Sequence, residues 1–109
     1  MKTGEIILIP FPFAELTNKK VRPAIVVCET KDFYQDLVIC AISSVVPKNL
    51  TANEMLLEKD STNNLRITSV AKIDRIVTAK RNDVIAVLGK LRETDLEGFR
   101  KKFIKLIDS

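Results

Sequence analysis

The chain has 109 residues, 46% of them hydrophobic and 29% charged, and a formal net charge of +4. This size and composition predict one soluble globular domain, residues 1–109, and leave no room for a second core. No segment approaches the roughly 20 apolar residues that span a bilayer. The apolar run at residues 6–13 is broken by two prolines and preceded by Glu5, which is unlike a secretory signal, so we expect a cytoplasmic protein.

The first half of the chain predicts short strands separated by polar turns. Residues 4–9 form a β-branched apolar run that we expect to end at the prolines of residues 10–13. A polar loop follows, and the next strand carries Pro23 near its start, where a missing N–H is tolerated. The further strands expected in this half lie at residues 21–29, 36–43 and 52–58.

The second half predicts one more clear strand, residues 67–78, and a terminal helix. Residues 83–88 fit either a strand or a short helical turn, which we expect Gly89 to end. Thr94 and Glu97 have the spacing of a capping box, so the helix is expected to start there. Its apolar stripe, which should pack on the sheet, comprises Leu96, Phe99, Phe103, Leu106 and Ile107. Many short strands and one helix predict a small, curved, mainly β sheet or barrel.

The residue types exclude several kinds of chemistry. The chain has no histidine, so serine–histidine triads, cysteine–histidine pairs and histidine-based RNA cleavage are ruled out. Its two cysteines, Cys28 and Cys40, cannot build the usual zinc site and are expected to be small buried hydrophobes rather than a disulfide. No glycine-rich nucleotide-binding motif or EF-hand spacing occurs. We therefore expect no metal ion and no cofactor.

The positive charge is concentrated in the C-terminal part. Residues 1–65 carry seven Lys or Arg against eight Asp or Glu, whereas residues 66–109 carry eleven against six. A basic face of this kind can bind nucleic acid, because cations that displace condensed counterions raise the affinity. On charge alone, a solvated basic surface is an equal alternative.

Five residues stand out as candidates for phosphate chemistry. Arg22 precedes Pro23 at the start of a strand, where a guanidinium can meet phosphate oxygens, although a surface arginine is the simpler interpretation. Ser43 ends an apolar run and is followed by Ser44, and such hydroxyls either bind phosphate or cap a turn. Lys72 and Asp74 are two apart in a strand and so project from one face, as partners in a site or in a solvated ion pair.

Five segments, in this order and spacing, resemble the MazF/PemK toxin family over nearly the whole chain. Each segment alone is weakly specific for the family, but the five together are strong evidence for the resemblance. They are residues 4–13 (GEIILIPFPF), 20–27 (KVRPAIVV), 38–44 (VICAISS), 69–78 (SVAKIDRIVT) and 89–91 (GKL). The resemblance implies a small SH3-like β-barrel of the PemK/CcdB type with a C-terminal α-helix, and a homodimer.

The resemblance also implies an activity. Members of this family are sequence-specific endoribonucleases that cut single-stranded RNA without a metal, leaving a 2′,3′-cyclic phosphate and a 5′-hydroxyl. A cognate antitoxin protein blocks the RNA groove and forms a DNA-binding complex with the toxin. The catalytic positions that match are Arg22, Asp74 and Ser43, which replaces a threonine of the family. The RNA-binding positions are Asn18, Lys19, Lys20, Ser44 and Lys72, and the family's loop histidine has no counterpart here.

Two other functions remain open on the sequence. One is a CcdB-like gyrase poison on the same barrel, against which Arg22 and Ser43 argue. The other is a non-catalytic RNA-binding module, for which Phe13 or Tyr34 would stack a base. The sequence also leaves open whether Arg22 or Asp74 is the general base, although an arginine pKa above about 12 favours Asp74.

Overall fold

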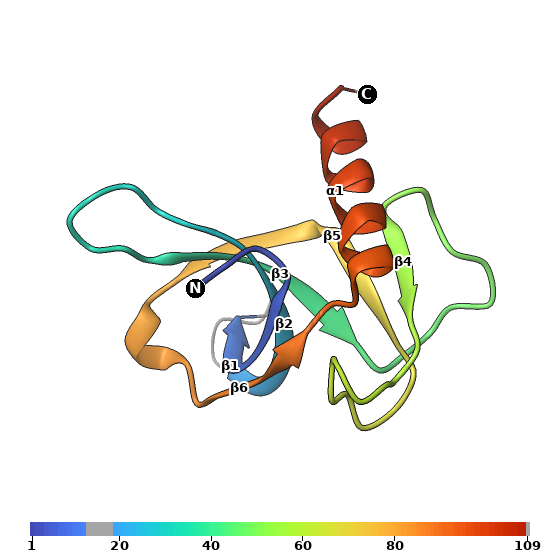
Figure 1. The fold of residues 1–109 in the computed structure, drawn as a ribbon, viewed down its shortest axis with the longest axis horizontal. Coiled ribbons are helices and arrows are strands. Elements are labelled where there is room, and N and C mark those ends of the chain that lie inside the picture. Colours follow the sequence, from blue (N-terminus) through green and yellow to red (C-terminus); the bar gives the residue numbers. More distant parts are fainter. Residues whose placement is uncertain (13–18, 109) are drawn as a thin grey trace.

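The protein is one six-stranded antiparallel sheet with a helix across one face (Figure 1). The computed structural model describes residues 1–12 and 19–108. The sheet order is β4-β5-β3-β2-β1-β6. The elements are β1 (Glu5–Pro12), β2 (Lys19–Glu29), β3 (Leu37–Ser43), β4 (Glu54–Leu57), β5 (Ser69–Ala79), the 3-10 turn η1 (Arg81–Asp83), β6 (Ala86–Lys90) and α1 (Glu93–Asp108). The predicted curved, mainly β fold with a C-terminal helix is confirmed.

The sheet buries apolar side chains on both faces. The helix-side cluster lies under α1, whose Leu96, Phe103 and Leu106 pack against it. Its buried members are Ile6, Ile25, Cys40, Ile42, Leu57, Leu65, Ala71, Ile73, Leu91 and Phe99. The far-side cluster comprises Ile7, Ile9, Phe11, Ala24, Val26, Leu37, Ile39 and Ala41. Successive strand residues therefore alternate between the two clusters, as the two-residue period of a strand requires.

The first strand continues through both prolines, where we expected it to stop. Leu8 accepts a hydrogen bond from the backbone N–H of Ile85, so its polar groups face the β6 side. Pro10 and Pro12 are two and four residues beyond Leu8, so their backbone nitrogens point to the same side as the polar groups of Leu8. Leu8 makes the last pair between β1 and β6, so no strand of the described chain lies opposite these nitrogens. The missing proline N–H therefore interrupts no ladder, and pairing with β2 continues to Pro12.

The helix begins one residue before the predicted cap, Thr94, and its cap is Arg92. The N–H of Leu96 donates to the carbonyl of Arg92 at 2.8 Å, so Arg92 is the cap position and Thr94 lies inside the first turn. The apolar stripe is confirmed except at its end: Ile107 is 73% exposed. The helix extends beyond the sheet there, so the Ile107 side chain lies in solvent.

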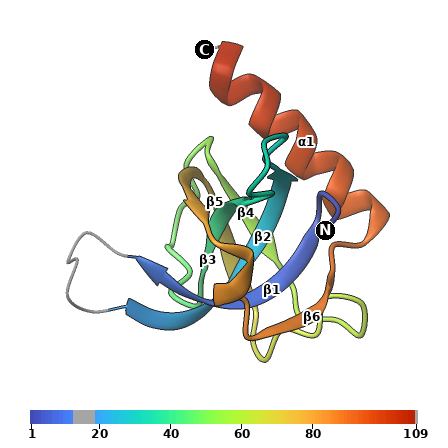
Figure 2. The same cartoon turned by 90° about the vertical axis from the view of Figure 1, so that its left-hand side faces the viewer.

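The segment after β4 closes the curl of the sheet against β6 (Figure 2). The N–H of Lys90 donates to the carbonyl of Thr62 at 3.0 Å, and the side-chain amide of Asn64 donates to that of Leu88 at 2.6 Å. Gly89 lies between these bonds, and a Cβ there would sit 2.2 Å from the Thr62 oxygen. The ambiguous segment is thus a strand, and Gly89 lies within it rather than ending it, because only glycine admits so close an approach.

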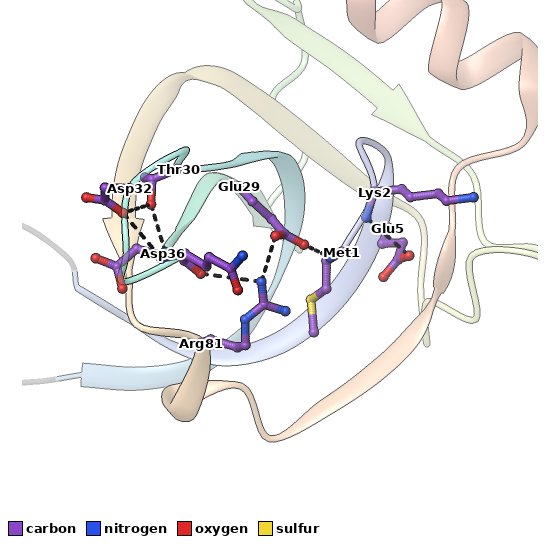
Figure 3. A network of polar contacts seen from close by, with 9 residues as sticks. Met1, Lys2, Glu5, Glu29, Thr30, Asp32, Asp36 and Arg81 are labelled. Atoms are coloured by element: carbon purple, nitrogen blue, oxygen red, sulfur yellow. Dashed lines mark hydrogen bonds and ion pairs between the residues drawn. The ribbon is translucent and has the colours of Figure 1, made fainter.

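The far end of the β2–β3 hairpin is held by a polar network (Figure 3). Glu29 accepts from the Met1 ammonium and pairs with Arg81 at 2.8 Å. Cys28 lies beside it, beyond a bulge between Val26 and Cys28. Both cysteines are free, as expected, but only Cys40 is buried; Cys28 is exposed because the bulge carries it past the packed part of the sheet.

Candidate functional site

Arg22 lies on β2 at the point where the β2–β3 ladder ends. The last pair of that ladder is Ala24 with Ala41, and Pro23 has no N–H with which to continue it. Arg22 is half-buried and its Nε atom is buried, so the base of the guanidinium is held within the protein. Its parity puts it on the face of the far-side cluster, next to Ala24.

Ser43 is the last residue of β3 and is half-buried. Its Oγ accepts a hydrogen bond from the backbone N–H of Val45 at 3.1 Å, which forms a turn of the serine type. This bond uses a lone pair of the oxygen, so the hydroxyl hydrogen is available to a further acceptor. Ser43 lies two residues beyond Ala41, and Arg22 two residues before Ala24. The two side chains therefore lie on the same face of the sheet, just beyond the last pair of the ladder. Ser44 follows and is exposed.

Lys72 extends this row across the sheet. It pairs with Ala41 of β3 on one side and with Glu54 of β4 on the other, so all three lie on one face. Its Nζ is 3.6 Å from Glu54 Oε2. The N–H of Thr51, which donates to Glu54 Oε1 at 2.8 Å, and the charge of Lys72 hold the pKa of the Glu54 carboxyl below its ordinary value.

A further cation joins the same face from β2. Lys20 is two residues from Arg22 and pairs with Phe11, a member of the far-side cluster. We call these five side chains the polar band: Lys20, Arg22, Ser43, Lys72 and Glu54. With three cations and one carboxylate, the band is net positive where the far-side cluster ends. Of the other predicted RNA-binding residues, Lys19 pairs with Pro12 but its side chain lies outside the described residues, as does all of Asn18.

Asp74 lies in a part of β5 that does not pair with β3. In β5, Lys72 pairs with Ala41 but Ile76 pairs with Cys40, so residues 73–75 bulge out of the β3–β5 ladder. Lys72 pairs with Glu54 across β4 and β5, and the face shared by Lys72 and Asp74 stays a prediction. Asp74 is exposed. The burial of Cys40 and, as a smaller cause, the charge of Asp74 raise the pKa of the Cys40 thiol to about 12.

Glu54 is the band residue that the sequence did not single out. The sequence of β4 is that of an ordinary amphipathic strand and does not mark Glu54. Its position opposite Lys72 follows from the register between β4 and β5, which a local pattern does not reveal. Within residues 1–12 and 19–108, no group of three or more His, Cys, Asp or Glu side chains is arranged to hold a metal ion. Over the same residues, no helix is long and apolar enough to cross a membrane.

Comparisons with known proteins identify the fold and the family. Residues 2–107 match the model of the PemK-like, MazF-like toxins of type II toxin-antitoxin systems. Among solved structures, the Mycobacterium tuberculosis toxin MazF-mt6 aligns with a TM-score of 0.70 at 16% identity, over 95% of this chain and 96% of that chain. A comparison with curated protein sequences finds no significant match. The chain belongs to the PemK-like, MazF-like toxin family.

Proposed function

We propose that this toxin is a sequence-specific endoribonuclease that cuts single-stranded RNA without a metal ion. The observation that carries the proposal is the shared face of Arg22, Ser43 and Lys72, which combines hydrogen-bond donors and positive charge at the end of an apolar cluster. Such a surface suits a phosphodiester, since planar guanidinium donors fit phosphate oxygens and a lysine adds a point charge.

In the proposed reaction the 2′-OH of the RNA attacks the adjacent phosphorus. As a base takes the 2′-OH proton, the O2′–P bond forms and the P–O5′ bond breaks. The leaving O5′ takes a proton from water, so the products end in a 2′,3′-cyclic phosphate and a 5′-hydroxyl. Arg22 and Ser43 stabilise the extra negative charge of the five-coordinate phosphorus. Donors held in place by the fold are most effective at such a point, and the buried Nε of Arg22 and the turn at Ser43 both supply that order.

Asp74 is our candidate for the general base that removes the 2′-OH proton. An arginine side chain stays protonated at neutral pH and is a poor base, whereas a carboxylate accepts protons readily. The bulge at residues 73–75 presents Asp74 to solvent, where a bound RNA strand can approach it. Lys20 and Lys72 bind neighbouring phosphates, and the same is proposed for Asn18, Lys19 and Ser44.

The family membership supports further parts of the proposal. A type II toxin has a cognate antitoxin, and we propose that it covers the polar band and joins the toxin in a DNA-binding complex. We also propose that the toxin acts in the cytoplasm as a homodimer.

The test is cleavage of a mixed-sequence single-stranded RNA in EDTA. Arg22→Ala should lower the rate by about 10²–10³-fold, as loss of one transition-state donor does, in a protein that thermal melting shows to be folded at the assay temperature. Arg100→Ala is the matched control, because Arg100 is exposed on α1, on the opposite face of the sheet. Asp74→Asn should reduce the rate at saturating RNA if Asp74 is the base.

Three results would contradict this proposal in different ways. Wild-type cleavage that disappears in EDTA would refute the metal-free reaction. RNA binding with no turnover would identify a binding module instead. Absence of RNA binding, combined with gyrase-dependent DNA cleavage, would identify a gyrase poison.

A further inference from the structure

The ion pair between Lys72 and Glu54 opposes the use of Lys72 for RNA binding. The two residues face each other across β4 and β5, with 3.6 Å between Nζ and Oε2. The Glu54 side chain is only 11% exposed and that of Lys72 is 33% exposed, so the pair is partly shielded from water. An ammonium held by a carboxylate at this distance contributes little net charge to a ligand.

The pair also draws the lysine in a definite direction. β4 lies on the opposite side of β5 from β3, so Glu54 and Ser43 lie on opposite sides of Lys72. Since Lys72 pairs with Ala41, it is a diagonal neighbour of Ser43, and such neighbours are about 7–8 Å apart. Turning toward a phosphate at Ser43 therefore moves the Lys72 ammonium away from Glu54.

Glu54 is itself fixed and charged. The N–H of Thr51 donates to its Oε1, and this bond is the first cause of a pKa below the ordinary value for a glutamate. The carboxylate therefore stays ionised through neutral pH. The other oxygen, Oε2, is the one nearest Lys72, so the two carboxylate oxygens have separate partners.

We propose that Glu54 is an internal competitor that RNA phosphate must displace from Lys72, so that it sets the affinity of the toxin for RNA. The inference rests on the proposed RNA-binding function of the polar band. In the free protein Glu54 holds Lys72 toward β4. On binding, the ammonium exchanges the carboxylate for a phosphate oxygen, and Glu54 is a positioning residue that never touches the scissile bond.

The test is the salt dependence of binding to a mixed-sequence 2′-O-methyl oligoribonucleotide, which lacks the nucleophile and is not cut. Glu54→Gln retains an oxygen for the Thr51 N–H and removes the charge. It should bind about two- to fivefold more tightly, the amount by which a partly exposed ion pair restrains a lysine. Its plot of log affinity against log salt should be steeper by up to about 0.7, because wild-type binding frees the Glu54 carboxylate to take up a cation, which offsets one released counterion, and the glutamine does not.

Two controls separate this effect from a general change of charge. Glu97→Gln makes the same change in net charge at an exposed ion pair with Lys101 on α1, and should leave both slope and affinity at the wild-type values. In a Lys72→Gln background, Glu54→Gln should have no further effect on the slope. Thermal melting of each variant verifies that the fold is retained.

The possible failures are distinguishable. If the wild type binds the oligonucleotide but Glu54→Gln binds no more tightly, the competition is refuted and the proposed function stands. An equal gain for Glu97→Gln, or a gain that persists without Lys72, refutes it as well, because the effect would then be long-range charge. If the wild type binds no single-stranded RNA, the proposed function and this inference both fail.

Discussion

Ser43→Ala should separate catalysis from stability more sharply than any other change in the polar band. The substitution removes one oxygen that has two tasks. In the free protein Oγ accepts the Val45 N–H at 3.1 Å in an exposed turn, and in the proposed transition state its hydrogen is donated to phosphate. An exposed hydrogen bond contributes about 0.5–1 kcal/mol to stability, because water replaces the lost partner. Loss of one transition-state donor costs about 2.7–4 kcal/mol, or 10²–10³-fold in rate.

The assay is single-turnover RNA cleavage in EDTA, measured beside urea unfolding of the same preparations. Ser43→Ala should cut slowly while its unfolding midpoint moves little. Ser43→Thr should cut at least as fast as the wild type, because threonine keeps the hydroxyl and restrains its rotation about χ1. The reasoning is refuted if Ser43→Ala cuts within about threefold of the wild-type rate, or if its loss of activity merely follows unfolding.

Two further predictions concern close packing. Gly89→Ala should destabilise the protein by about 1–3 kcal/mol, because its Cβ would lie 2.2 Å from the backbone oxygen of Thr62. Gly98→Ala should stabilise the protein by up to about 1 kcal/mol, because alanine favours the helix and its Cβ would lie an ordinary 3.5 Å from Met55 Sδ. Urea unfolding measures both free energies, and a change of the same sign in the two variants would contradict this reasoning. Burial and Asp74 raise the pKa of Cys40 to about 12, so its thiol stays protonated below that pH. At mildly alkaline pH, iodoacetamide should therefore label the exposed Cys28 in the folded protein and Cys40 only after unfolding. Mass spectrometry identifies the labelled residue, and labelling of Cys40 in the folded state would contradict its burial.

Local sequence signals predicted the elements well and their ends less well. The apolar stripe of α1 is a local pattern, and four of its five predicted members pack as expected. Its start was misplaced because Thr94 has the chemistry of a cap, whereas the Arg92 carbonyl already accepts the Leu96 N–H. Pro10 was expected to end β1 because a sequence does not reveal that β6 stops pairing at Leu8.

The candidate site was predicted residue by residue but not as an arrangement. The motifs located Arg22, Ser43 and Lys72, and the register brings these three onto one face. The partner of Lys72 could not be predicted, because the pairing of β4 with β5 is non-local and the bulge at residues 73–75 adds an irregularity that no period detects. A single sequence therefore indicates the charged side chains of a site more readily than the partners that neutralise their charge.

The position of Lys72 follows from the packing of its neighbours. Ala71 and Ile73 are both fully buried in the helix-side cluster, so the backbone between them has little freedom to move. The pleat of the strand then projects Lys72 to the opposite face, into the polar band. The same argument applies to Ser43, which follows the buried Ile42. Packing beneath α1 thus orders the strands that carry the groups proposed to meet phosphate on the other side of the sheet, and the ion pair with Glu54 restrains the Lys72 side chain.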